Sequence, residues 1–324
     1  MRVLIDTSYA LRGPSGTATY ILEFTAALRR LGVEVVEAAN ERRRPPAGGG
    51  LGSARNLLED RRWTTRSLPQ FAADTSADLI HHPLPALARQ PPCPQVVTVH
   101  DLAFEVHPEH FDRRFARWAR RAHRRAAEQA EVVICVSETT AADVREHWEV
   151  DDGRIVVAHH GPGQELPAVE PGEPRHVLYV GDAEPRKNLA LVHAADLPLP
   201  LCHAGEGGEP VDPPTLARLY AHALALVHPS VHEGFGLTPL EAMAAGVPVV
   251  AVRNRAVVEV CGDAAIYVDA TDPAPLEQAL QRLYDDPGHR AAMVAAGRAR
   301  AGRFSWRASA EAHVRAYERA LEAR

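Results

Sequence analysis

Short runs of β-branched residues alternate with longer amphipathic stretches, and this alternation constrains the fold more than any other feature of the sequence. In the first half, buried strands are predicted at Arg2 to Asp6, Val33 to Glu37, Leu79 to His82, Val96 to Val99, Val132 to Val136 and Ile155 to Ala158. Helices are predicted between them at Ala18 to Leu31, Ala54 to Ala73, Arg113 to Ala130 and Thr139 to Trp148. This pattern is typical of a parallel, doubly wound α/β sheet.

The same alternation starts again at His176, after a segment rich in proline and glycine that has no periodicity. Strands are predicted at His176 to Val180, Leu201 to His203, Leu224 to Val227, Pro248 to Val252 and Ala265 to Val268. Helices are predicted at Leu189 to Leu197, Thr215 to Ala223, Pro239 to Ala245 and Pro275 to Asp285. We therefore predict two Rossmann-like domains, over residues 1–163 and 176–304, joined by a linker at 164–175.

Two remaining segments are less constrained by their patterns. Residues 305–324 form a last helix, Trp306 to Leu321, which either ends the second domain or returns to the first. The segment Arg42 to Gly52 is predicted to be a mobile loop without chemistry. Because ligands of open parallel sheets lie at the carboxyl ends of the strands, we expect the site in a cleft between the two domains.

Composition excludes several classes of protein. The net charge is −6, and neither half of the chain carries the basic excess that nucleic-acid binding requires. The four cysteines have no metal-binding spacing, which favours buried thiols in a reducing compartment. No uncharged apolar run approaches the roughly 18 residues of a membrane span. We expect a cytoplasmic protein, and peripheral contact with the inner face of the membrane stays open.

The stretch HEGFGLTPLE places Glu233 and Glu241 on either side of a turn with two glycines. Thr238, Pro239 and Glu241 fit a capping box, which explains Glu241 without any ligand. Glu233 precedes the turn and has no such local role. A turn from a strand into a helix exposes backbone N–H groups and the positive end of a helix dipole, which suit a phosphate or diphosphate.

The segment Glu184 to Asn188 follows another predicted strand and contains the only lysine of the chain, Lys187. Among so many arginines, a single lysine indicates a position where a compact ammonium group is required, although chance survival at the surface is the alternative. Arg186 stands beside it. Two cations and a helix N-terminus at one sheet edge predict a diphosphate site.

In the first half, His100 follows the strand that ends at Val99, and the turn Gly13 to Gly16 follows the first strand. A histidine at the end of a strand is more often a polar residue with an ordinary partner than a ligand contact. The glycines of the turn either allow a ligand to approach the backbone or only form a tight turn.

The helix that begins near Phe111 is basic and carries aromatic residues on one face, at Phe111, Phe115 and Trp118. We expect this aromatic stripe to pack on the sheet while the arginines form a solvated face. The alternative is a surface formed by the Arg113 to Arg125 helix that meets anionic lipid headgroups or an anionic acceptor.

Several of these segments, in this order, resemble the retaining glycosyltransferases of family 4, which have the GT-B fold of two Rossmann-like domains facing each other across a cleft. HEGFGLTPLEAMAAGVPVV is similar to the E-x7-E signature of that family, and YVGDAEPRKNL to its donor-phosphate segment. VVTVHDLAFEVHPEHF and VICVSETTAADV are similar to two segments of the first domain. The resemblance covers nearly the whole chain.

The resemblance implies a donor site in the second domain. Arg186 and Lys187 would hold the diphosphate of a nucleotide-sugar donor, together with backbone amides around the glycine turn. The donor-binding residues it implies are Gly16, Arg186, Lys187, Glu233, Gly234, Phe235, Gly236, Leu237, Thr238 and Glu241.

The resemblance also implies the chemistry. Glu233 would contact hydroxyls of the transferred sugar, Glu241 would bind the ribose, and His100 would lie beside the anomeric centre, so that His100 and Glu233 are the catalytic candidates. Gly16 would border the donor phosphates and the acceptor. Members of the family transfer a hexosyl group, here with a faint preference for mannosyl, to a hydroxyl acceptor with retention, without metal or other cofactor.

One departure from the family pattern concerns the segment between Lys187 and Glu233, which is shorter than expected and includes GEGGEPVDPP. The nucleotide base is therefore not predicted. Two alternatives stay open beside the transferase: a sugar-nucleotide epimerase on the same scaffold, and a non-catalytic sugar-nucleotide binding partner.

Overall fold

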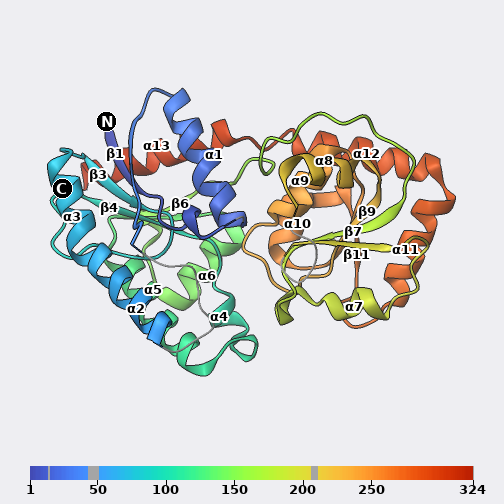
Figure 1. Ribbon diagram of the computed structural model, residues 1–324, viewed down its shortest axis with the longest axis horizontal. Helices are drawn as coiled ribbons and strands as arrows, with labels where there is room; N and C mark the ends of the chain where they lie inside the picture. Colours follow the sequence, from blue (N-terminus) through green and yellow to red (C-terminus); the bar gives the residue numbers. More distant parts are fainter. Residues whose placement is uncertain (14, 43–50, 206–210, 324) are drawn as a thin grey trace. The chain divides into compact units, whose positions relative to one another are not determined.

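Each half of the chain forms its own parallel sheet, covered by helices (Figure 1). The computed structural model describes residues 1–13, 15–42, 51–205 and 211–323, without the side chains of residues 51–54 and 57. One compact unit consists of Met1–Gly161 and Trp306–Arg324, and the second consists of Pro162–Ser305. Most of the loop predicted at Arg42 to Gly52, and half of GEGGEPVDPP, lie outside the described residues.

Six parallel strands form the sheet of the first unit, in the order β2-β1-β3-β4-β5-β6. They are β1 (Arg2–Asp6), β2 (Glu34–Ala38), β3 (Leu79–His82), β4 (Gln95–Val99), β5 (Val132–Cys135) and β6 (Ile155–Val157). The α-helices are α1 (Gly16–Arg30), α2 (Leu51–Arg62), α3 (Leu68–Asp74), α4 (Ala103–Val106), α5 (Arg113–Gln129), α6 (Glu138–Trp148) and α13 (Trp306–Glu322). Because neighbouring strands are parallel, their carboxyl ends share one edge of the sheet.

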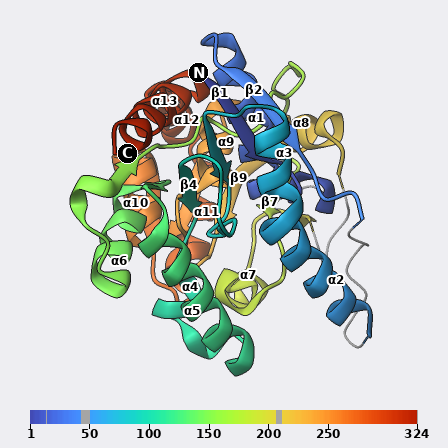
Figure 2. The ribbon, with the colours of Figure 1, turned by 90° about the vertical axis from the view of Figure 1, so that its left-hand side faces the viewer.

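Different helices cover the two faces of this sheet, because alternate residues of a strand point to opposite sides. Val96 and Val132 pack with residues of α1 and α13, whereas Val97 and Val133 pack with residues of α5 and α6. The last helix, α13, therefore belongs to the first unit. Both views place the two chain termini at the same end of this unit (Figure 1, Figure 2).

A buried chain of hydrogen bonds fixes α13 against the sheet. Nδ1 of His313 lies 2.7 Å from a carbonyl one turn earlier in α13, so it donates, and Nε2 accepts from the hydroxyl of Tyr20 at 2.7 Å. Tyr20 accepts from Thr98 (2.9 Å), which accepts from His81 (2.8 Å). The Tyr317 hydroxyl donates to the other nitrogen of His81 at 2.8 Å. Every member is satisfied only if both histidines are neutral, and burial lowers the pKa of His313 to about 4.

We expect Tyr317→Phe to destabilise the first unit by about 1–3 kcal/mol, because it leaves the acceptor nitrogen of His81 buried without a donor. The measurement is the free energy of unfolding from a urea titration. Tyr284→Phe is the matched control, since Tyr284 is 46% exposed. An unchanged free energy in Tyr317→Phe would show that the bond does not stabilise the fold.

Five parallel strands form the sheet of the second unit, in the order β11-β10-β9-β7-β8. They are β7 (His176–Val180), β8 (Leu201–Ala204), β9 (Ala223–His228), β10 (Val249–Val252) and β11 (Ala265–Val268). The α-helices are α7 (Leu189–Ala194), α8 (Pro213–Ala221), α9 (Leu237–Ala245), α10 (Arg255–Cys261), α11 (Ala274–Asp285) and α12 (Pro287–Ala301). β7 and β9 are neighbours, although β8 lies between them in the sequence.

The predicted strands are all present in the described residues, with ends that agree to within one residue. The helices α4, α10 and α12 were not predicted, although Asp286 caps α12 and Pro287 follows it at the first helical position. None of the four cysteines forms a disulfide. In the part of the chain that the structure describes, no helix is long and apolar enough to cross a membrane.

The prediction that the aromatic stripe of α5 packs on the sheet is wrong for two of its three members. Phe115 and Trp118 are 45% and 52% exposed, and Phe111 alone packs against the core. The buried face of α5 consists of small residues, Ala116, Ala119, Ala126 and Ala127. Alanine allows the helix to lie close to the sheet, so the larger rings on the adjacent face are directed to solvent.

Candidate functional site

Two loops meet at the carboxyl edge of the second sheet, because β7 and β9 are neighbours there. The loop after β7 leads into the 3₁₀ turn Pro185–Lys187, and the loop after β9 carries Glu233 toward α9. The N–H of Val231 donates to the carbonyl of Arg186 at 3.0 Å and ties the loops together. The fold thereby brings Lys187 and Glu233, 46 positions apart, into contact.

Basic side chains surround the carboxylate of Glu233. Nζ of Lys187 donates to Oε1 at 2.7 Å, and Nη1 of Arg186 lies 3.8 Å from Oε2. Nε2 of His228, the last residue of β9, lies 3.3 Å from Oε1. The side chains of Lys187 and Glu233 are only 17% and 12% exposed. The predicted residues Arg186, Lys187 and Glu233 therefore form one cluster.

The charge state of Glu233 follows from these contacts. Burial alone raises the pKa of a carboxyl, but Lys187, His228 and Arg186 outweigh burial and hold the pKa of Glu233 well below its usual range. Glu233 is thus ionised at neutral pH and a weak base. It can accept hydrogen bonds from hydroxyl groups, but it is poorly suited to remove a proton.

The helix α9 begins at Leu237, and the preceding Gly236 has a φ of +107°, which favours glycine. As a glycine, Gly236 provides no side-chain cap for this N-terminus. The predicted capping box is therefore wrong: the positive φ of Gly236 starts the helix before Thr238, which lies inside its first turn together with Pro239. The N–H groups of Leu237 and Thr238 lie at the positive end of the helix dipole.

The carboxylate of Glu241 accepts its hydrogen bonds from groups outside α9. It accepts from the hydroxyl of Tyr220 in α8 at 2.9 Å and from the N–H of Gln164 at 3.3 Å. The backbone at Gly163 lies so close to this carboxylate that a Cβ added there would overlap with Oε1 of Glu241. With Tyr220 and Gln164, Glu241 lines a pocket of about 280 Å³. Within the described residues, Glu233 and Glu241 share no hydrogen-bond or ion-pair partner.

The pKa of Glu241 is shifted in the opposite direction to that of Glu233, and the cause is burial. It raises the pKa of Glu241 above the usual value, and the hydrogen bonds from Tyr220 and Gln164 offset only part of this effect. The two glutamates of the E-x7-E pattern are therefore in different electrostatic environments. The first is charged and surrounded by cations, and the second carries its charge at a cost.

His100 follows β4 at the carboxyl edge of the first sheet. Nε2 lies 2.9 Å from the carbonyl oxygen of Pro83, so Nε2 carries the proton and Nδ1 is the acceptor. Burial lowers the pKa of His100, which keeps the ring neutral at pH 7. The ring packs edge-on against Tyr20 at 4.9 Å and lies 5.8 Å from that of His160. His100 can accept a hydrogen bond from a hydroxyl.

Gly16 is the first residue of α1, and Ser15 caps the helix by accepting from the N–H of Ala18 at 3.1 Å. The helix starts beyond the carboxyl end of β1, in the same sheet as β4. Gly13 has a φ of +112°, so the turn requires glycine there for its backbone conformation. Pro14 lies outside the described residues.

The sequence patterns did not predict two partners of the candidate residues: His228, beside Glu233, and Tyr220, beside Glu241. A usable signal existed for His228, because it ends an apolar strand in the same way that His100 follows one. Tyr220 has no such signal. It belongs to an ordinary amphipathic helix, and only the packing of α8 on α9 brings it to Glu241.

The sequence matches two family models in succession. Residues 14–162 match the model Glycosyltransferase Family 4, and residues 209–300 match the model Glycosyl transferases group 1. The chain is a GT-B glycosyltransferase. The first model lies in the unit that carries His100 and Gly16, and the second contains Glu233 and Glu241.

Similar proteins agree with this fold and activity. The glycosyltransferase is 28% identical to O-antigen chain mannosyltransferase B from Escherichia coli over 265 residues, which cover 69% of this chain and 70% of the relative. Sucrose-phosphate synthase from Thermosynechococcus elongatus has the same fold, with a TM-score of 0.78 at 20% identity and full coverage of both chains. Anabaena HepE, solved with UDP and glucose, has a TM-score of 0.68 at 16% identity. The match covers 97% of this chain and 98% of the HepE chain.

We expect Lys187→Gln and Glu233→Gln to be non-additive in the glycosyltransferase, because each removes the partner of a buried charge. A double-mutant cycle on the free energy of unfolding should give a coupling of about 0.5–3 kcal/mol. The exposed pair Arg307 and Glu311 is the control cycle, and its coupling should be close to zero. Additive losses at Lys187 and Glu233 would mean that the ion pair does not hold the two loops together.

We expect Glu241→Gln to be pH-dependent. Gln offers one acceptor oxygen instead of two, so one hydrogen bond, worth about 0.5–1.5 kcal/mol, is lost. Because the pKa of Glu241 is higher in the folded state than in the unfolded state, the wild type loses stability as the pH rises through the folded-state pKa. Gln does not titrate, so the variant lacks this loss. The difference in Tm between wild type and variant should therefore shrink from acidic to neutral pH.

Glu165→Gln is the control for this experiment, because Glu165 is exposed in the same segment as Gln164. Its difference in Tm from the wild type should be small at every pH. A difference for Glu241→Gln that grows with pH would contradict the raised pKa.

Proposed function

We propose that this glycosyltransferase moves a hexosyl group, of which mannosyl is the first candidate, from a nucleotide diphosphate sugar to a hydroxyl acceptor, with retention and without a metal ion. The products would be a glycan, a glycolipid or a glycosylated metabolite. One observation carries the proposal: Arg186, Lys187 and the uncapped N-terminus of α9 lie on loops of neighbouring strands.

These groups suit a diphosphate. The ammonium group of Lys187 has three N–H donors and uses one for Glu233 in the described part of the chain. Arg186 adds a forked, permanently charged donor, and the N–H groups of Leu237 and Thr238 add neutral ones. We assign the compensation of the diphosphate charge to these groups, and no divalent metal is required for it.

The sugar and the ribose would be held by carboxylates and a histidine. We assign contacts with sugar hydroxyls to Glu233, which is ionised and accepts hydrogen bonds, and to Nδ1 of the neutral His100. We assign the ribose to Glu241, whose oxygens have lone pairs left beside those used by Tyr220 and Gln164. Gly234, Phe235 and Gly236 shape the turn around the donor.

The charge state of Glu233 favours a mechanism without a protein base. The bond from the anomeric carbon to the diphosphate breaks, and the acceptor oxygen forms its bond on the same face. The acceptor proton passes to the leaving diphosphate oxygen, because Glu233 is too weak a base to take it. Lys187 and Arg186 stabilise the charge on the leaving group.

The mannosyl assignment is supported by the Escherichia coli relative, which is named a mannosyltransferase. We further propose that the enzyme works in the cytoplasm, in peripheral contact with the inner face of a membrane through α5. The exposed Phe115 and Trp118 beside the arginines of α5 support this contact, because aromatic and basic side chains together suit an anionic lipid surface.

The test is slow hydrolysis of the donor by the whole chain, with a panel of UDP-sugars and GDP-sugars that includes GDP-mannose. We expect release of free sugar from one of them, with EDTA present. Lys187→Gln should reduce the rate about tenfold or more, since a hydrogen bond to a charged group is worth about 1.5–3 kcal/mol. Arg218→Gln, an exposed arginine of the same unit, should leave the rate unchanged.

Other outcomes would reject specific parts of the proposal. An epimerised nucleotide sugar would indicate an epimerase, and binding without turnover would indicate a non-catalytic role. Loss of the reaction in EDTA would reject metal independence. Retention is checked by proton NMR of the newly released sugar before its anomers equilibrate, and the inverted anomer would reject it.

A further inference from the structure

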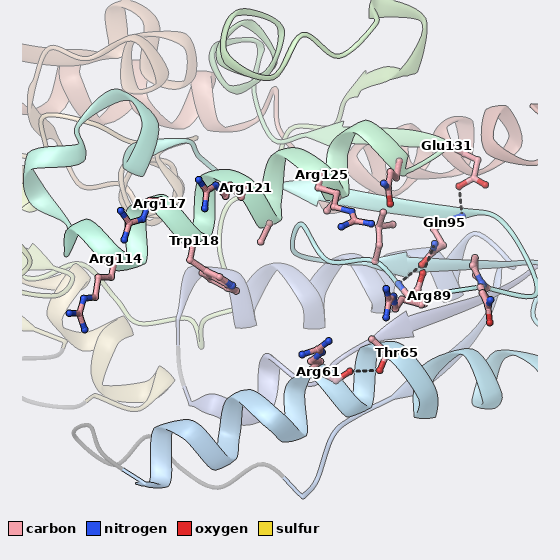
Figure 3. Close-up of a pocket in the computed structure, with 17 residues that line it drawn as sticks. Arg61, Thr65, Arg89, Gln95, Arg114, Arg117, Trp118, Arg121, Arg125 and Glu131 are labelled. Carbon is pink, nitrogen blue, oxygen red and sulfur yellow. Dashed lines mark hydrogen bonds between the residues drawn. The ribbon is translucent and has the colours of Figure 1, made fainter.

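A groove of about 890 Å³ in the first unit lies between α2, α5 and the loop that leads into β4. Figure 3 shows α2 with Arg61 along one side, α5 along the other side, and Arg89 between them. Six arginines line this arginine groove: Arg61, Arg89, Arg114, Arg117, Arg121 and Arg125. Three separate segments of the chain thus direct guanidinium groups to one concave surface.

The arginines of this groove differ from others on the same helix. Arg120 forms an ion pair with Glu105 at 2.7 Å, and Arg124 forms pairs of 2.8 Å with Glu128 and Glu149. Over residues 1–13, 15–42, 51–205 and 211–323, none of the six arginines of the groove has an ion pair with an acidic residue of the chain. Within the described residues, the folded chain therefore provides carboxylates for Arg120 and Arg124 and leaves the six arginines of the groove without them.

One acidic residue, Glu131, also lines the groove. Its Oε2 accepts the backbone N–H of Gln95 at 2.7 Å, so this carboxylate fixes the start of β4. Six guanidinium groups against one carboxylate make the groove strongly positive in a chain whose net charge is −6. A concave surface with charge of one sign concentrates ions of the opposite sign. One guanidinium group can donate two parallel hydrogen bonds to the oxygens of a phosphate.

The groove is long enough for more than one anionic group. Arg114 and Arg125 are eleven positions apart on α5, which corresponds to about 16 Å along the helix axis. Gln95 and Glu131 lie at the amino ends of β4 and β5, whereas His100 follows the carboxyl end of β4. The groove therefore follows α5 along the sheet and suits an extended ligand better than a single phosphate.

Trp118 adds an apolar surface to the groove. Its ring is 52% exposed and lies 6.0 Å from the ring of Phe115, which is 45% exposed. Large exposed rings on a helix whose buried face is alanine stabilise no core. Beside arginines, they suit a ligand that carries apolar atoms next to its phosphates.

We propose that the arginine groove binds the phosphate groups of an extended anionic ligand. This ligand is the acceptor substrate, an assignment that rests on the proposed transferase function. The source of the phosphates is either a lipid headgroup or a soluble phosphorylated molecule. Arg121 and Arg125 are the central contacts, and Trp118 packs against the apolar part of the ligand.

The test uses the fluorescence of Trp118 in the whole chain, defined as the signal that Trp118→Phe lacks. This local signal separates the groove from Arg186 and Lys187, which can also bind phosphates. The probes are inorganic tripolyphosphate, and vesicles of phosphatidylcholine with and without phosphatidylglycerol. We expect the signal to change with tripolyphosphate, with phosphatidylglycerol vesicles, or with both.

A pair of double variants with the same change in net charge distinguishes a site from general attraction. Arg121→Gln with Arg125→Gln should raise the half-saturating concentration about tenfold or more, because charge-assisted hydrogen bonds are lost. Arg66→Gln with Arg113→Gln, which are exposed and outside the groove, should change it less than twofold. Circular dichroism confirms that both proteins are folded.

Each outcome decides the proposal. A response to tripolyphosphate that depends on Arg121 and Arg125 supports it with a soluble source, and a response confined to phosphatidylglycerol vesicles supports it with a lipid source. No response to any probe, or equal losses in the two double variants, overturns it. Donor hydrolysis is measured separately, so a failure at the groove is distinguishable from a failure of the proposed transferase function.

Discussion

Parallel pairing of every strand is the constraint on which the rest of the structure depends. It places the carboxyl ends of all strands of a sheet at one edge, so residues that follow different strands become neighbours. In the second unit, β9 pairs with β7, and this pairing brings Lys187 to Glu233. In the first unit, the same rule places His100 and the start of α1 at one edge. Within each unit, strand order thus decides which candidate residues become neighbours.

Polar groups in the interior are arranged so that few of them need a charge. The chain from Tyr317 through His81 to His313 is satisfied by neutral rings and hydroxyls, which fix α13 without the desolvation cost of an ion pair. Glu233 is the contrast, because three basic groups surround it and keep it charged. A buried charge with its own cations at the edge of a sheet suits the binding of a polar ligand.

The arginines of the first unit also differ in whether their charge is compensated within the described part of the chain. On α5, Arg120 and Arg124 form ion pairs with carboxylates, and among the residues that the structure describes the arginines of the groove have no such partner. Like charges that face one another lower stability unless a ligand compensates them, so an arrangement of this kind fits binding better than folding. The wrongly predicted aromatic stripe belongs to the same surface. Trp118 lines the groove because alanines, with their small side chains, form the contact with the sheet.

The sequence by itself determined the strands, their parallel arrangement and the segments that carry Arg186, Lys187, Glu233 and His100, because periodicity and strand ends are local properties. It did not determine the partners of the two glutamates. A capping box is a local pattern too, but the positive φ of Gly236 starts the helix before Thr238. The packing of α8 on α9 then lets Glu241 accept a hydrogen bond from Tyr220. Only the tertiary structure decided this, and it also gathered Arg61, Arg89 and the arginines of α5. Contacts between distant segments depend on how helices pack, which local patterns do not encode.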